Sequence, residues 1–137
     1  MDANRFFSIP YDATHDFKIR RLKIKGGGII AYGRWVALLG MLYDEHGLID
    51  LNDNATNLVV QMELELLTEE MPKFFELLAE VGLIDSELYH SLNHVVNSGV
   101  CEELEYRKQK SEAGKKGLEN RWGKGKKPDK TRANSNC

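Results

Sequence analysis

The longest apolar stretch of the chain runs from Ile29 to Tyr43 and predicts a buried helix. Four large side chains recur in it at positions i, i+3, i+4 and i+7, the spacing of one helical face. They are Trp35, Leu38, Leu39 and Leu42. Gly33 and Gly40 lie in the same stretch, and each lowers the helix propensity by about 1 kcal/mol relative to alanine. We expect these glycines to permit close packing against a neighbouring element.

Two further amphipathic patterns predict helices. Asp53 or Asn54 can cap a helix that runs to about Met62. The residues predicted to share one face of this helix are Ala55, Leu58, Val59 and Met62. The next helix ends near Val81, and it starts at a Thr68 cap or nearer Pro72, which prefers the first helical position. Its predicted inner face is Met71, Phe74, Phe75 and Leu78. Its outer face is Glu69, Glu70, Lys73, Glu76 and Glu80.

The tetrapeptide Gly-Leu-Ile-Asp occurs twice, at residues 47–50 and 82–85, each time after an apolar helix. Two identical short apolar segments predict two strands that pair with each other, and residues 87–89 predict a short third strand. The resulting order is helix, strand, helix, helix, strand, strand. This order is typical of a winged helix-turn-helix fold. We therefore expect a mainly α (α+β) protein with a small antiparallel β element and a basic C-terminal helix.

The net charge of −2 conceals a strong asymmetry along the 137 residues. Residues 1–25 carry +3, residues 26–106 carry −13, and residues 107–137 carry +8. The acidic middle repels a polyanion, whereas the basic flanks attract one. The charge and hydrophobic patterns together divide the chain into a basic N-terminal segment (1–25), a winged-helix core (26–92), a basic C-terminal helix (93–122) and a disordered basic tail (123–137).

The basic flanks are the candidate nucleic-acid-binding site, because such a density of cations neutralises phosphates. The N-terminal candidates are Lys18, Arg20, Arg21, Lys23 and Lys25. The C-terminal candidates are Arg107, Lys108, Lys110, Lys115, Lys116 and Arg121. Trp122 either stacks on a base or docks the helix end on the core, and we expect docking.

The sequence gives little support for metal binding, catalysis, a disulfide scaffold or membrane association. His90 and His94 have the spacing of two zinc ligands on a helix, but the glutamate of the HExxH motif is absent. No nucleophile and base stand together in a recognisable motif, and two cysteines are too few for a disulfide scaffold. We see no signal peptide and no span long enough for a bilayer. We therefore expect a cytoplasmic, non-enzymatic protein that uses no metal or cofactor and does not contact a membrane.

Three pieces of the sequence carry a resemblance to a known family. They are His15-Asp16-Phe17-Lys18, the stretch from Ala31 to Leu39 (AYGRWVALL) followed by Gly47-Leu48-Ile49, and the basic stretch from Lys110 to Trp122 (KSEAGKKGLENRW). Over residues 6–122 the chain resembles the N-terminal domain of phage replisome-organiser proteins, including the Listeria-phage-like domain in that group. The resemblance implies a winged-helix domain that binds DNA at a replication origin and helps to recruit replication proteins such as a helicase loader.

Three functions are therefore compared below. The first is a DNA-binding accessory or initiation protein of phage or mobile-element replication. The second is a winged-helix transcription regulator of a mobile element. The third is a protein-interaction module that docks a basic partner through the acidic outer face of the third helix.

Overall fold

The computed structural model describes the backbone of residues 7–122 and the side chains of residues 7–113, apart from Thr14. A short 3₁₀ turn at Ala13–His15 precedes the first α-helix. The elements that follow are α1 (Phe17–Gly26), α2 (Ile29–Asp44), β1 (Leu48–Asp50), α3 (Asn54–Leu64), α4 (Glu70–Val81), α5 (Ser86–Leu92), β2 (His94–Val96) and α6 (Ser98–Trp122). Among the described residues no helix is both long enough and apolar enough to cross a membrane.

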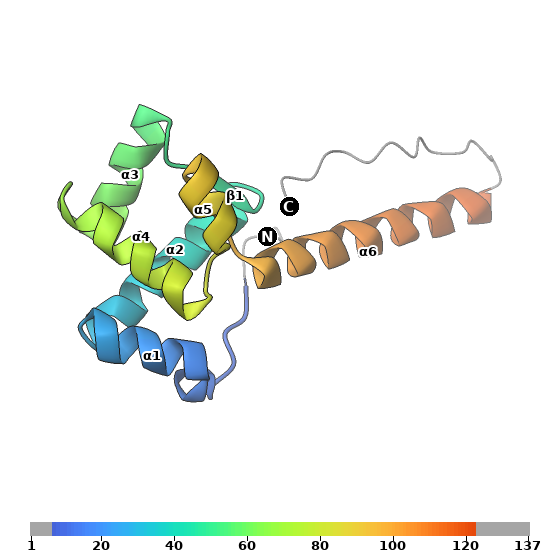
Figure 1. Cartoon of the computed structure of the whole chain (residues 1–137). Helices are drawn as coiled ribbons and strands as arrows, with labels where there is room; N and C mark the ends of the chain where they lie inside the picture. Colours follow the sequence, from blue (N-terminus) through green and yellow to red (C-terminus); the bar gives the residue numbers. More distant parts are fainter. Residues whose placement is uncertain (1–6, 123–137) are drawn as a thin grey trace.

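Helix α2 lies at the centre of the fold, in contact with α1, α3, β1 and α6 (Figure 1). The predicted helix is confirmed, and Trp35, Leu38 and Leu42 are buried as expected, whereas Leu39 is only partly buried. The expectation for Gly33 is wrong. This glycine is exposed, and a Cβ atom built there meets no described atom within 4 Å. It therefore contributes no close packing.

Helix α4 contributes more buried residues than any other described helix. All four residues of its predicted inner face are buried, together with Ala79 and Val81. Phe75 is fully buried, with its ring edge-on to Phe74 and stacked on Tyr89 of α5. Because α1 also packs on α4 and buries Ile19 and Leu22, the core contains part of the basic N-terminal segment.

The predicted helix is confirmed as α3, and Asp53 caps it through a bond from the Thr56 N–H. The buried residues of α3 are Val60 and Leu64, whereas the four residues predicted to share one face, Ala55, Leu58, Val59 and Met62, are exposed. The helix therefore presents its apolar stripe to solvent.

The predicted strand pairing is also wrong. β1 pairs antiparallel with β2, with Leu48 opposite Val96 and Asp50 opposite His94. Residues 82–85 form no strand; their Asp85 caps α5 by accepting from the Leu88 N–H, and its own N–H donates to the Val96 carbonyl at 2.8 Å. The predicted third strand at residues 87–89 is part of α5. The two copies of the repeated tetrapeptide thus lie on either side of β2 instead of pairing with each other.

Helix α6 leaves the core and extends away from it (Figure 1). It begins at Ser98, with the Asn97 side chain accepting from the Val100 N–H. The structure as a whole confirms a mainly helical α+β class with a small two-stranded antiparallel sheet. The predicted order is confirmed for α2, β1, α3 and α4, but the next element is α5 and not the strand expected at residues 82–85, and β2 follows α5. The tail predicted over residues 123–137 lies outside the described residues.

Candidate nucleic-acid interface

Helix α1 is held in place by its apolar side and by both of its ends. The Asp16 carboxylate accepts from the Lys18 and Ile19 N–H groups at 2.8 and 3.4 Å, which caps the N-terminus. At the other end Gly27 adopts a left-handed conformation, with φ of 102°, and closes the helix. With Ile19 and Leu22 buried, the opposite side of α1 faces solvent.

That outward side, which we call the α1 face, consists of Phe17, Arg20, Arg21 and Ile24. Phe17 and Ile24 expose 71% and 82% of their surface. The Arg21 guanidinium lies 5.6 Å from the centre of the Phe17 ring, within the range of a cation–π interaction. Sequence analysis missed Phe17 and Ile24, although their spacing of seven residues places them on the same side of a helix as the two arginines.

Two lysines of α1, Lys18 and Lys25, lie against the end of α4. Lys25 Nζ forms an ion pair with Glu80 Oε2 at 2.5 Å, and this bond holds the pKa of the Glu80 carboxyl below its usual value. Lys18 passes beside Gly82, the left-handed residue that ends α4, where a positive charge complements the helix dipole. Lys23 is half-buried. Of the five predicted N-terminal cations, Arg20 and Arg21 are therefore the two that belong to the α1 face.

Among the predicted cations of α6, Arg107 has a structural contact. Its Nε donates to Glu103 at 3.1 Å, and its guanidinium lies 5.1 Å from the Tyr43 ring of α2. Phe7 stacks on the same ring at 5.0 Å. Arg107 thus fastens the start of α6 to the core.

The remaining cations of α6 lie farther along the helix. Lys108 is half-buried, and Lys110 is exposed near the Tyr106 ring. Lys115, Lys116 and Arg121 belong to the outer part of the helix, and their side chains and that of Trp122 lie outside the described residues. Figure 1 shows α1 and the far end of α6 on opposite sides of the molecule, so the predicted cations form two regions and not one continuous surface.

The acidic outer side of α4 is partly neutralised from within the molecule. Glu80 pairs with Lys25, as described above, and Glu76 accepts from His90 Nε2 at 2.9 and 3.0 Å. The other ring nitrogen of His90 lies 3.2 Å from the Ser86 hydroxyl. The Glu76 hydrogen bond raises the pKa of His90. This serine–histidine–glutamate chain, which sequence analysis did not foresee, pins α5 to α4 and is exposed to solvent.

The two histidines considered as zinc ligands are on different elements. His94 lies in β2, with its Nε2 3.6 Å from Asp50 of β1, whereas His90 bonds to α4. Within the part of the chain that the structure describes, no group of three or more histidine, cysteine or acidic side chains is arranged to hold a metal ion.

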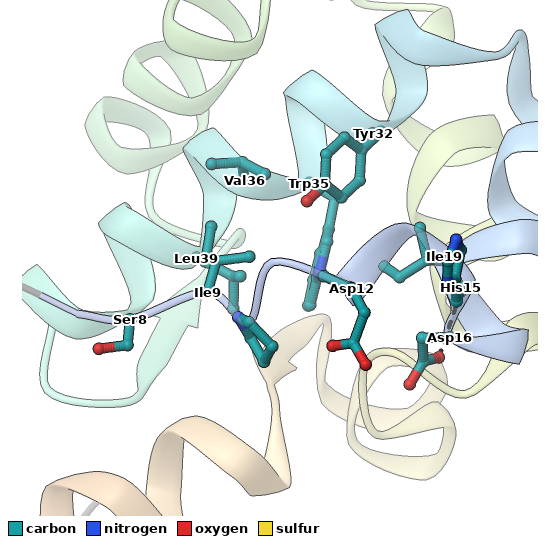
Figure 2. Close-up of a pocket in the computed structure, with 12 residues that line it drawn as sticks. Ser8, Ile9, Asp12, His15, Asp16, Ile19, Tyr32, Trp35, Val36 and Leu39 are labelled. Atoms are coloured by element: carbon teal, nitrogen blue, oxygen red, sulfur yellow. Dashed lines mark hydrogen bonds between the residues drawn. The ribbon is translucent and has the colours of Figure 1, made fainter.

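A pocket of about 400 Å³ lies where the N-terminal segment crosses α2 (Figure 2). Tyr32 and Trp35 of α2 line it together with Ile19 of α1, and Asp12 and His15 stand on the N-terminal segment. Its volume lies in the range of small-molecule sites. The Asp16 carboxylate at its edge already caps α1, so it is engaged in holding the helix.

These observations define the class of the protein as a small, mainly helical α+β domain with a basic, partly apolar face on its first helix. The chain belongs to the Lin1244/Lin1753-like N-terminal domain family, whose model matches residues 6–99. The matched region includes every element from α1 to β2 and reaches the first residues of α6. No curated protein and no solved structure matches the chain.

Proposed function

We propose that the protein is a non-enzymatic DNA-binding accessory or initiation protein of phage or mobile-element replication. The observation that carries the proposal is the α1 face, where the exposed Arg20 and the half-buried Arg21 flank an exposed aromatic ring on a helix that is capped at both ends. Arginine binds phosphate in a bidentate manner, and an exposed aromatic ring offers a surface on which a base can stack. The replication role is supported by the resemblance to phage replisome-organiser proteins, which also suggests a helicase loader as a partner.

The charge distribution supports α1 and α6 as the DNA-contacting elements. The equivalent of a winged-helix recognition helix is α4, the last helix of the helix–turn–helix unit. Its outward residues Glu69 and Glu76 would face phosphates, and the resulting repulsion opposes binding. By contrast, the outer part of α6 and the residues after it add eight bases and two acids from residue 114 onward. We therefore place the backbone contacts on α1 and α6, with α4 as part of the scaffold.

The ion pairs that α4 already makes argue against docking of a basic protein through this helix. Two of the carboxylates that such a partner would need, Glu76 and Glu80, already pair with His90 and Lys25. A basic partner would have to displace both pairs. On the α1 face, by contrast, Arg20 is exposed to solvent.

A titration of labelled duplex DNA followed by fluorescence anisotropy tests the proposal. If about 4–6 phosphates are neutralised, the logarithm of the affinity falls with the logarithm of salt with a slope of roughly −4 to −5. Replacing both arginines, Arg20→Ala with Arg21→Ala, should weaken binding and make the slope shallower by roughly 2. Lys73→Ala, which removes an exposed cation from the acidic side of α4, is the matched control.

Two results would contradict the proposal. One is affinity for duplex DNA that does not change with salt. The other is a double arginine variant that binds as well as the wild type while the Lys73 variant loses affinity. Binding to a palindromic operator, with repression of a nearby promoter, would assign the protein to transcription instead of replication.

A further inference from the structure

The exposed apolar side of α3 is unusual for a helix at the surface of a small domain. We call this side the α3 face; it consists of Ala55, Leu58, Val59 and Met62. Leu58, Val59 and Met62 expose 63%, 45% and 67% of their surface. Val60 and Leu64, which α3 does bury, lie on the other side of the helix. An apolar stripe with helical spacing ordinarily covers a core or a partner.

We propose that the α3 face is a contact surface between two copies of this chain. The distribution of charge along the chain supports this contact. Residues 26–106 carry a charge of −13, yet no charged residue lies between Asp53 and Glu63. In a two-fold dimer the same patch meets itself, so any charge within it would face its own copy. The α3 face avoids that repulsion, and it has no charged group that would recognise a partner of opposite sign.

One border of the α3 face is polar and uncharged, and its side chains are already engaged, whereas the exposed Glu63, four residues after Val59, lies on the other border. Asn57 donates to the Leu51 carbonyl at 3.1 Å, and Gln61 donates to Asn57 at 2.9 Å. Thr68, in the turn after α3, donates to Gln61 at 3.1 Å and holds that turn against the helix. An ordered border lowers the entropy lost when two faces meet.

The area available sets the strength of the contact. One face of an eleven-residue helix buries less than the roughly 800 Å² per partner of a standard interface. We therefore expect a weak dimer, with a dissociation constant on the order of 10–100 µM. This proposal does not rest on DNA binding, because the contact requires no nucleic acid.

Sedimentation velocity of the full chain over a concentration series, without DNA, tests the proposal. An acidic variant carries Leu58→Glu with Met62→Glu, and a basic variant carries Leu58→Lys with Met62→Lys. Each variant alone should remain monomeric, because like charges meet across the two-fold axis. An equimolar mixture of the two should recover dimer, because opposite charges then meet. Leu92→Glu, which changes an exposed leucine of α5, should dimerise like the wild type.

The changed side chains are exposed in the monomer, so thermal melts followed by circular dichroism should show all the variants folded. The proposal is overturned if the wild type stays monomeric up to about 1 mM, well above the expected dissociation constant. It is also overturned if both charged variants still dimerise, which would place the contact elsewhere. A mixture of acidic and basic variants that stays monomeric would show that the two α3 faces do not meet.

Discussion

The side chain of Arg34, a residue of α2, bonds to the end of α3. Its Nε donates to the Leu64 carbonyl at 2.7 Å, and one terminal nitrogen donates to the Glu65 carbonyl at 2.9 Å. These carbonyls belong to the last turn of α3, where no further helical N–H is available to them. Glu65 itself takes a left-handed conformation there. A single arginine thus satisfies two acceptors and fixes the turn that leads to α4.

We predict that Arg34→Ala lowers the free energy of unfolding by about 1–3 kcal/mol, because two carbonyls lose a charged donor. Arg34→Lys should recover only part of this loss, since an ammonium group cannot reproduce the fork of a guanidinium. Urea unfolding of the three proteins measures the effect. Lys73→Ala, an exposed surface change, should stay within about 0.5 kcal/mol of the wild type. Equal stability of the alanine variant and the wild type would show that the two bonds contribute nothing.

His90 predicts a pH dependence of the contact between α4 and α5. The Glu76 hydrogen bond raises the pKa of His90 above its unfolded value, so the imidazolium favours the folded state. That stabilisation is fully present below the unfolded pKa of about 6.5 and is lost as pH rises through the higher folded pKa. Glu76→Gln should therefore destabilise the protein more at about pH 5.5 than at about pH 8.5.

Unfolding experiments at the two pH values measure this difference. An NMR titration provides the direct readout: the pKa of His90 should fall in the Glu76→Gln protein. A His90 titration that does not move would rule out the Glu76 bond as the cause.

At the scale of elements, two glycines at the start of the helical core have opposite roles. Gly27 ends α1 with φ of 102°, a conformation that side chains rarely adopt. Gly33 lies in regular helix within α2, exposed and with open space where a Cβ would go. The first glycine is required by the turn between α1 and α2, and the second only weakens α2.

We predict opposite effects for alanine at these two positions. Gly27→Ala should lower the free energy of unfolding by about 1–2 kcal/mol through left-handed strain. Gly33→Ala should raise it by about 0.5–1 kcal/mol, because alanine favours the helix and restricts the unfolded chain. Thermal or urea unfolding of both variants checks the pair. Two changes of the same sign would contradict this account of α1 and α2.

On the scale of the whole molecule, the basic surface is divided. The α1 face lies on one side of the core, and the outer part of α6 extends from the other (Figure 1). A straight DNA duplex that contacts one of these two regions does not have to contact the other. If both regions bind DNA, each makes its own contact with the phosphate backbone. The salt slope of binding should then be the sum of one contribution from the α1 face and one from the outer part of α6.

We predict that the triple variant Lys115→Gln, Lys116→Gln and Arg121→Gln makes the salt slope shallower by roughly 3 if each of these residues contacts a phosphate. Affinity should fall to a similar extent on unrelated duplexes, because phosphate contacts carry no sequence information. Combining this variant with the arginine changes on α1 should give additive losses, since the two regions are far apart. An unchanged slope in the triple variant would show that these three residues contact no phosphate.

The local elements of this protein follow from local sequence. The apolar spacing of α2 and α4 and the Asp53 cap of α3 are interpretable within a window of a few residues, and these helices form where predicted. Short-range spacing places side chains on one face of a helix, and capping groups satisfy the N–H groups at its first turn.

Tertiary contacts decided which side of α3 is covered and which segments pair. The apolar residues of α3 have helical spacing, which shows that one face of the helix is apolar. The spacing does not show what covers that face. Likewise, the two Gly-Leu-Ile-Asp copies have the same strand propensity. After the second copy, Ser86 begins α5 and Asp85 becomes its cap, so β1 pairs with residues 94–96 instead.

The same distinction applies to the candidate site. The cations were visible in the sequence, whereas their division between the α1 face, the contacts of Lys25 and Arg107, and the extended α6 was not. That division depends on partners distant in sequence: Lys25 meets Glu80 and Arg107 meets Tyr43 only after the helices pack. Composition reports the number of charges, but only the folded chain determines which of them remain at the surface to meet a ligand.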